Sequence, residues 1–405
     1  MGYRLVEIDF AQPLRPIALA ADQNGCGIVA RWHGRLVGFH LERCEPGATL
    51  SVAHLQRIAD ARFAQAVLAA RVAEALPERS PEAADTTLSV VICTKDRAQR
   101  LARLLHSLHE AKRDSTFRSV EVIVVDNAST DQSTRDAAAG FGDVRYVLER
   151  RTGLNFARNA ALAAATGQLI AYLDDDVVVD RCWLAGLAEA WRSRPDAGGF
   201  TGLVLPFRLD TEAQVHFEAI GGFGRGFARL EYRQVRFAKS LFPVGSGEIG
   251  AGCNMAFDRK LLVGIGGFDE ALDTGAPLPG GGDLDIFYRV LRSGRTMVYE
   301  PRYAVYHEHR ETIAQLRRQY WSWGLGMMAF LIKSRRSDPE LKARHSGMVR
   351  WWFGDRSKAL WKAILRGGMR DVRFVLAELW GGVVGLLGEY DRSLARVAAI
   401  REAAR

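Results

Sequence analysis

Between residues 88 and 173 the chain alternates short apolar segments with helical ones, and this alternation constrains the fold more than any other feature. Helical segments are predicted at 98–109, from Gln132 onward, and at 155–166, where Gly167 follows as a stop. Strands that alternate with helices predict an α/β fold with a mostly parallel sheet flanked by helices. The predicted strands are LSVVIC (88–93), VEVIVV (120–125), VRYVL (144–148) and QLIAYL (168–173).

Polar and acidic side chains follow three of these four predicted strands directly. They are Thr94, Lys95, Asp96 and Arg97 after the first strand, Asp126 after the second, and Asp174, Asp175 and Asp176 after the fourth. Because ligands bind beyond the carboxyl ends of the strands in such sheets, we expect these groups to share one edge. Clustered carboxylates without neighbouring thiolates suit a hard divalent cation such as Mg²⁺ or Mn²⁺.

These acidic residues could have ordinary structural roles instead of binding a metal. Asp and Asn at strand ends often serve as turn residues or helix caps, and we expect Asp131 and Asp180 to be caps. Three consecutive aspartates after a buried strand repel one another, which favours a bound cation instead. The chain lacks a GxxxxGK[ST] loop, and no GxGxxG follows the first strand, so metal and side chains would have to hold any phosphate.

A second group of polar residues lies between residues 282 and 309. The segment GGDLDIFYRVLRSG predicts a helix from about Asp283, where the helix dipole stabilises the carboxylates of Asp283 and Asp285. For Asp285, capping and a functional role both remain open. The segment TMVYEPRYAVYHEH then predicts two short strands that end at His307 and His309, and His307 is a candidate metal ligand.

With these residues in place, the segment 88–309 resembles family 2 of the inverting glycosyltransferases, which have a GT-A fold. The resemblance implies transfer of a sugar from a nucleotide-diphosphate sugar to a hydroxyl of a glycan, an envelope polysaccharide or a lipid-linked acceptor. It rests on six segments in the family's order: VVICTKDRAQRLARLLHSL, VEVIVVDNASTD, GLNFARNAALAAATGQLIAYLDDD, GAGCNMAFDRKLLVGIGGFDE, GGDLDIFYRVLRSG and YEPRYAVYHEH.

The resemblance also implies roles for single residues on the donor side. The triplet 174–176 corresponds to the family's DxD motif, in which Asp176 would bind Mn²⁺ or Mg²⁺ and Asp174 or Asp175 would contact ribose or metal-bound water. His307 would be a further metal ligand, ahead of His309. The remaining donor-binding residues would be Thr94, Asp96, Arg97 and Asp126 around the nucleoside, and Arg158 near the pyrophosphate or the acidic triplet.

The resemblance places the general base at Asp283. The family's usual pattern is Glu-Asp-x-Asp, whereas this chain has Gly282 before Asp283. The departure leaves no acid at 282 to take part in acceptor binding, but it keeps the base. Asp283 would take the proton from the acceptor hydroxyl while that hydroxyl displaces the nucleotide in one inverting step.

Around this segment we expect three further parts, which gives four in all. Residues 1–76 read as a small α+β unit with a hairpin at His33-Gly34-Arg35, residues 77–87 as a linker, and residues 88–309 as the GT-A domain. Residues 310–405 read as a basic, Trp-rich helical extension. The N-terminal unit carries no motif and would serve as an interaction or acceptor-selecting module.

The C-terminal extension is the most basic part of the chain. From Arg310 to Arg405 there are 19 Lys and Arg against 9 Asp and Glu, so the residues before Arg310 are together close to neutral within a net charge of +8. Six of the nine tryptophans also lie there. Its apolar segments 320–332 and 374–388 are short for a membrane span, and both core packing and contact with an anionic membrane surface remain open.

Composition narrows the location and the class of partner. Five scattered cysteines without a CxxC pair argue against a disulfide framework and fit a reducing cytoplasm, and no signal peptide is visible. We therefore expect a cytoplasmic protein, in some settings at the inner face of the cell membrane. A nucleic-acid partner is not expected, because the aromatic residues lie in apolar runs. A nucleotidyltransferase and a catalytically inactive nucleotide- or lipid-binding scaffold remain as alternatives.

Overall fold

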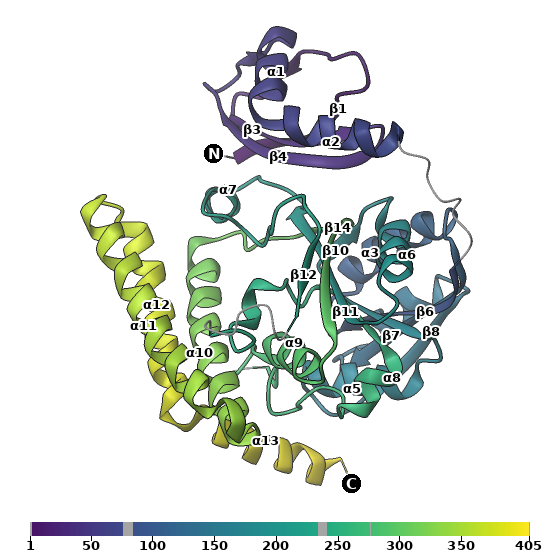
Figure 1. Cartoon of the computed structure of the whole chain (residues 1–405), viewed down its shortest axis with the longest axis vertical. Coiled ribbons are helices and arrows are strands. Elements are labelled where there is room, and N and C mark those ends of the chain that lie inside the picture. Colours follow the sequence, from purple (N-terminus) through teal and green to yellow (C-terminus); the bar gives the residue numbers. More distant parts are fainter. Residues whose placement is uncertain (1, 76–83, 234–240, 276, 405) are drawn as a thin grey trace.

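The computed structural model of the protein describes residues 2–75, 84–233, 241–275 and 277–404, and its centre is one large sheet (Figure 1). The strand order is β10-β14-β11-β13-β9-β6-β7-β8, with β12 paired to β14 beside this path. The strands are β6 (Ala84–Thr94), β7 (Phe117–Asn127), β8 (Val144–Glu149), β9 (Leu169–Asp174), β10 (Val177–Val179), β11 (Ala197–Pro206), β12 (Leu230–Tyr232), β13 (Asn254–Asp258) and β14 (Thr296–His307).

The sheet combines parallel and antiparallel pairing. Strands β9, β6, β7 and β8 are parallel to one another, and β11 is parallel to β14. Strands β10, β12 and β13 run antiparallel to the strands beside them. The parallel part coincides with the strand–helix alternation of residues 88–173, and the predicted α/β fold class is confirmed.

Helices cover both faces of this sheet, and the alternation of side chains along β6 shows how. Val90 and Ile92 face a core that contains α3, α4 and α6, whereas Val91 and Cys93 face a second core with α5, α8 and α9. A short helix, α7, lies after β11. The bounds are α3 (Ala98–Lys112), α4 (Ser133–Ala139), α5 (Leu154–Ala164), α6 (Trp183–Ser193), α7 (Glu212–Ala219), α8 (Arg259–Gly264) and α9 (Gly282–Arg292), with a 3₁₀ turn at Ser246–Glu248.

The N-terminal residues form a separate small sheet with its own core. Strand β3 pairs with β1 in parallel and with β4 in an antiparallel hairpin, whose turn places His33 and Gly34 at positive φ and confirms the predicted hairpin. Two helices that are separated by a π-helical turn pack against it. The elements are β1 (Gly2–Asp9), β2 (Ile17–Ala18), β3 (Gln23–Trp32), β4 (Arg35–Arg43), β5 (Thr49–Leu50), α1 (Val52–Ile58), the π turn Ala59–Phe63 and α2 (Ala64–Ala75).

The chain continues after the large sheet as a helical extension. Helices α10, α11 and α12 pack together along one side of the molecule (Figure 1). None of the helices in the described ranges is long and apolar enough to cross a membrane. The elements are α10 (Ile313–Ser337), a 3₁₀ turn (Pro339–Leu341), α11 (Lys342–Leu365), α12 (Met369–Val384), a π turn (Gly385–Glu389) and α13 (Tyr390–Ala403).

Two local predictions differ from the structure. Residues 84–87 of the predicted linker belong to β6, and residues 77–83 lie outside the described residues. The two strands predicted within 296–309 are one strand, β14, which ends at His307. Its pairing with β11 shifts register between Gly202 and Val204, so the strand continues past Pro301 through an irregularity instead of ending there.

A buried ion pair joins the N-terminal unit to the large sheet. Arg31 of β3 is 1% exposed, and its guanidinium pairs with Asp180, which follows β10. The same guanidinium lies 2.7 Å from Glu7 and donates a 2.9 Å hydrogen bond to the Tyr306 hydroxyl of β14. Although burial disfavours its charge, the two carboxylates raise the pKa of Arg31 above its ordinary value. Asp180 also accepts a 2.9 Å hydrogen bond from the Cys182 N–H in the turn before α6 (Trp183–Ser193). The N-cap of that helix is Cys182, so the prediction that Asp180 is a cap is wrong.

Arg31→Ala tests this connection. The substitution leaves Asp180 buried without its cation, and we expect the free energy of unfolding to fall by about 3 kcal/mol. Urea denaturation followed by circular dichroism measures the change. Arg35→Ala, on the exposed start of the same hairpin's second strand, is the matched control and should stay close to wild type. Equal stability of the two variants would show that the pair contributes little.

Candidate active site

Asp175 is the most firmly held of the three consecutive aspartates. Thr94 Oγ1 donates to Asp175 Oδ2 at 2.8 Å, and Arg97 Nη1 donates to Asp175 Oδ1 at 2.8 Å. The parallel pairing of β6 with β9 brings these residues together at one edge of the sheet. Burial raises the pKa of Asp175, and the nearby Asp176 adds to this against the lowering effect of Arg97. Both carboxylate oxygens are occupied by protein donors.

Asp176 is buried beside a histidine. Its Oδ1 atom has no hydrogen-bond partner among the described residues and lies 3.4 Å from His307 Nε2. Arg310 and Arg97 lie 3.9 and 4.0 Å from its Oδ2 atom. The antiparallel pairing of β10 with the end of β14 fixes this approach. Burial, with His309 and Arg310 nearby, holds the pKa of His307 well below its ordinary value, so the ring is neutral and can offer a lone pair.

His309 has a different partner. Its Nδ1 atom lies 3.0 Å from His307 Nδ1, and its Nε2 atom lies 2.6 Å from a carboxylate oxygen of Glu218 in α7. The two rings also pack against Phe223. His309 therefore orients His307 and leaves the Nε2 atom of His307 directed at Asp176.

Arg158 connects two buried carboxylates. Its Nη1 atom donates to Asp273 Oδ2 at 3.1 Å, and its Nη2 atom lies 3.6 Å from Asp174 Oδ1. Burial raises the pKa of Asp174 to about 7 against the lowering effect of Arg158, and the neighbouring carboxylates of Asp176, Asp175 and Asp273 raise it further. Burial likewise raises the pKa of Asp273 to about 6. One arginine thus compensates two acids whose negative charge is costly in this position.

Asp273 explains why glycine stands before Asp283. A Cβ atom on Gly282 would lie 2.2 Å from Asp273 Oδ2 and 2.6 Å from Asn155 Nδ2. A backbone hydrogen bond from Gly282 lowers the pKa of Asp273, opposing the effect of burial. The carboxylate of Asp273 therefore occupies the space next to Gly282 in which a side chain at 282 would begin. An acid is present at this point, but it comes from another part of the chain.

Asp283 stands in the first turn of α9. Its Oδ1 atom accepts a 2.8 Å hydrogen bond from the Leu284 N–H, and its side chain is half-buried. A Cβ atom on Gly252 would lie 3.0 Å from the Cβ atom of Asp283, so the loop before β13 passes close to this residue. Asp285, two residues further along the helix, is fully buried and ion-paired with Arg289 and Lys333. Its contacts are structural.

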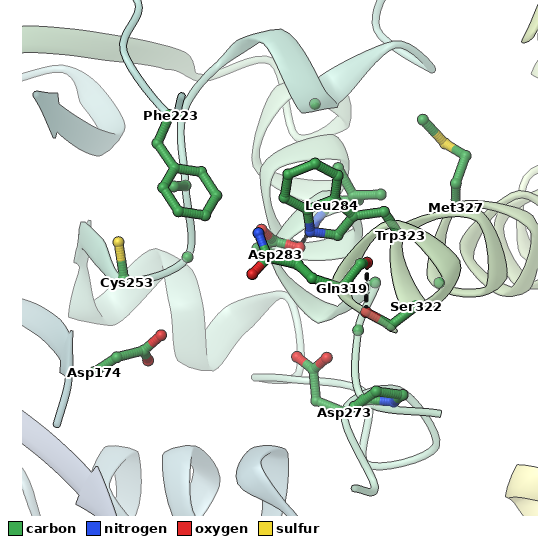
Figure 2. A pocket seen from close by; sticks show the side chains of 18 of the residues that line it. Asp174, Phe223, Cys253, Asp273, Asp283, Leu284, Gln319, Ser322, Trp323 and Met327 are labelled. Atoms are coloured by element: carbon green, nitrogen blue, oxygen red, sulfur yellow. Dashed lines mark hydrogen bonds between the residues drawn. The ribbon is translucent and has the colours of Figure 1, made fainter. Parts of the chain in front are cut away.

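A cavity of about 450 Å³ joins these groups. Figure 2 shows the carboxylates of Asp174, Asp273 and Asp283 around it. Of the residues predicted from the sequence, Arg158, Asp174, Asp283 and His307 line the cavity. Thr94, Asp96, Arg97, Asp126, Asp175 and Asp176 are not among its lining residues.

Asp96 and Asp126 form a neighbouring group at the ends of β6 and β7. Asp96 Oδ1 accepts the Thr130 N–H at 2.6 Å, and the Asp96 N–H donates to Ser129 Oγ at 3.0 Å. Asp126 accepts the Ser129 N–H at 2.9 Å and the Tyr146 hydroxyl at 2.7 Å. The loop after β7 thus ties both aspartates to the same edge as the triplet.

The sequence alone did not reveal much of the opposite wall. Figure 2 shows the side chains from α10 and Phe223 from a separate loop. Helices α11 and α12 make smaller contributions. The sequence feature that pointed to this wall was the high number of tryptophans in the C-terminal extension. That number does not show which tryptophans are buried and which are exposed. The residues concerned are Gln319, Ser322, Trp323, Gly326, Met327, Trp352 and Glu378.

No group of three or more His, Cys, Asp or Glu side chains in residues 2–75, 84–233, 241–275 and 277–404 is arranged to hold a metal ion by itself. The pair of Asp176 and His307 offers two donors of suitable type, an unpartnered carboxylate oxygen and a neutral imidazole nitrogen. This donor set fits Mn²⁺ or Mg²⁺ bound partly through a phosphate, since such ions often take only one or two protein ligands.

Residues 89–263 match the model of glycosyl transferase family 2. This segment is therefore similar to family 2 glycosyltransferase domains. The match covers the sheet edge with the acidic triplet and confirms, at the level of the family, the predicted class of enzyme. The segments that carry α9, His307 and the C-terminal helices lie beyond the matched range.

Several curated proteins are similar over a comparable range. A pre-mycofactocin glycosyltransferase of Mycobacterium tuberculosis is 29% identical over 256 residues, which cover 62% of this chain and 48% of that protein. The succinoglycan biosynthesis protein ExoM of Rhizobium meliloti is 28% identical over 247 residues, 58% of this chain and 72% of that protein. The chain thus spans about half the length of the first of these relatives.

One solved structure is similar over much of the chain. The mannosyltransferase PcManGT of Pyrobaculum calidifontis, in complex with GDP-Man and Mn²⁺, aligns with a TM-score of 0.46 at 18% identity. The alignment covers 78% of this chain and 94% of the mannosyltransferase.

Gly282→Ala tests the close approach to Asp273. The added methyl group overlaps a buried carboxylate, and we expect a loss of about 1–3 kcal/mol in the free energy of unfolding. Gly264→Ala at the end of α8 is the control, because a Cβ atom there meets nothing within 4 Å. In the double variant with Asp273→Gly the penalty should shrink. Additive losses would show that the two positions do not interact.

Proposed function

We propose that this protein is a metal-dependent inverting glycosyltransferase that moves a sugar from a nucleoside-diphosphate donor to a hydroxyl acceptor. The observation that carries the proposal is the single cavity that joins Asp174 and Arg158, from the acidic edge of the sheet, with Asp283 at the start of α9. The family match supports transfer from a nucleotide sugar in general. The mechanism, the metal and the residue roles below belong to the proposal.

The donor would lie along the acidic edge. We assign the nucleoside to Thr94, Asp96, Arg97 and Asp126 and the diphosphate to the region between Arg158 and Asp176. Asp176 and His307 would hold Mn²⁺ or Mg²⁺, which when bound offsets the charge that develops on the leaving diphosphate. The guanidinium groups of Arg158, Arg97 and Arg310 lie within 4 Å of carboxylate oxygens of the aspartate triplet 174–176. These arginines limit the repulsion between the donor's phosphates and the aspartates.

The acceptor would enter from the side of α10. Asp283 takes the proton from the attacking hydroxyl, which approaches the anomeric carbon on the face opposite the leaving diphosphate, so the configuration inverts. The Leu284 N–H holds one carboxylate oxygen of Asp283 at 2.8 Å. Trp323 and Met327 supply an apolar surface and Gln319 and Ser322 polar groups, a combination that suits a sugar or a lipid-linked sugar.

The site of action forms part of the same proposal. The acceptor is a glycan, an envelope polysaccharide or a lipid-linked carbohydrate, and the protein would work in the cytoplasm, in contact with the anionic inner face of the cell membrane. The exposed tryptophans and basic residues of the C-terminal helices support this contact.

Release of nucleoside diphosphate from a panel of nucleotide sugars tests the proposal without knowledge of the acceptor. Slow release from one donor should require Mn²⁺ or Mg²⁺, stop with EDTA, and fall roughly 100-fold or more in Asp176→Ala, because the charge compensation is lost. Asp114→Ala, an exposed aspartate after α3, is the control.

Donor binding by calorimetry completes this experiment. If the nucleotide sugar binds only with metal, and Asp176→Ala abolishes this binding, the donor site is supported even where release of nucleoside diphosphate is slow. Release that is unaffected by EDTA would contradict the metal assignment, and absence of both binding and release for every donor would favour the inactive scaffold.

A further inference from the structure

The end of the helical hairpin formed by α11 and α12 exposes an unusual amount of apolar surface. We define the hairpin tip as residues 358–376, which include the last turns of α11, the connecting residues 366–368 and the first two turns of α12. Trp361, Leu365 and Met369 are 62%, 69% and 66% exposed, and Ile364 and Leu376 are also exposed. Solvent-exposed side chains of this size in one place mark a surface that has a partner.

The hairpin tip is also strongly basic. It carries five cationic residues and a single acid, Asp371, which lies 3.1 Å from His216. Arg370 is paired with Glu212 at 2.6 Å. The other cations have no ion-pair partner among the described residues; they are Lys358, Lys362, Arg366 and Arg373. An anionic surface would compensate them.

A second cavity opens beside the hairpin tip, where α10 and α12 begin. It measures about 540 Å³, and Arg317, Arg370 and Arg373 line it together with Met369 and Phe374. Arg317 and Arg373 have no ion-pair partner within the described parts of the chain. A cavity with an apolar lining and arginines fits the phosphate and upper acyl chain of an anionic lipid.

The two helices of the hairpin connect the tip to the active-site cavity. Trp352 of α11 lines that cavity and lies nine residues before Trp361, and Glu378 of α12 lines it nine residues after Met369. At 1.5 Å per residue, the tip is about 14 Å along each helix from the cavity. Figure 1 shows both helices at the outer side of the molecule, next to α10. A surface bound by the tip would therefore be close to the acceptor side of the cavity.

We propose that the hairpin tip docks on an anionic phospholipid surface, with Trp361, Leu365 and Met369 in the interface and the free lysines and arginines on the lipid phosphates. A second copy of the chain suits this face poorly, because pairing would bring two sets of cations together. This docking surface rests on the proposed function in one respect, namely that the acceptor is carried by a lipid. Trp and Leu beside Lys and Arg are the composition of interfacial helices.

Vesicle co-sedimentation of the full chain tests the docking surface. We expect binding to vesicles of phosphatidylcholine and phosphatidylglycerol in a seven-to-three ratio, and little binding to phosphatidylcholine alone. The triple variant Trp361→Ser/Leu365→Ser/Met369→Ser and the charge variant Lys362→Glu/Arg366→Glu should each bind roughly tenfold more weakly. The control is Leu68→Ser/Val72→Ser, which removes two exposed apolar side chains of α2.

The outcomes separate this proposal from the proposed function. Release of nucleoside diphosphate from the soluble donor should be unchanged in the hairpin-tip variants, since these residues lie outside the active-site cavity. Vesicle binding without any donor turnover would contradict the proposed function and leave the docking surface standing. Equal binding to neutral and anionic vesicles, or full binding by either variant, would overturn the docking surface. So would a wild-type protein that does not bind vesicles but forms a dimer in light scattering, if the hairpin-tip variants lose that dimer.

Discussion

The arrangement of the active site depends on how its carboxylates are kept from repelling one another. Asp174, Asp175 and Asp176 follow one strand, and Asp273 comes within hydrogen-bond distance of the same arginine that approaches Asp174. Arg158 and Arg97 compensate part of this charge, but burial still raises the pKa of Asp174 and of Asp273. The same arginine holds the loop before α9 against α5, so the charge balance also places Asp283.

Much of the fold and one wall of the cavity could be predicted from the sequence. The strand–helix alternation places the ends of β6, β7 and β9 at one edge, because parallel strands must point the same way. The positions of Arg158, Asp174 and His307 relative to the cavity follow from that order and from the pairing of β10 with β14. The roles assigned to these residues remain predictions.

Contacts between distant segments could not be read from the sequence. Asp273 belongs to no motif, and its position against Gly282 depends on a loop that adopts positive φ at Asp273. The apolar segments 320–332 and 374–388 have similar composition, yet the first supplies buried residues such as Leu325 and Phe330 and the second also exposes Trp380. Composition does not distinguish these outcomes, because a helix can bury one face and expose the other.

The central claim is that Asp283 acts as the base on a donor held at the acidic edge. The most direct measurement compares turnover with donor affinity for Asp283→Asn, with Asp136→Asn in the first turn of α4 as the control. We expect Asp283→Asn to bind the donor as wild type does while turnover falls roughly 100- to 10,000-fold. Unchanged turnover in a folded, donor-binding Asp283→Asn protein would contradict it.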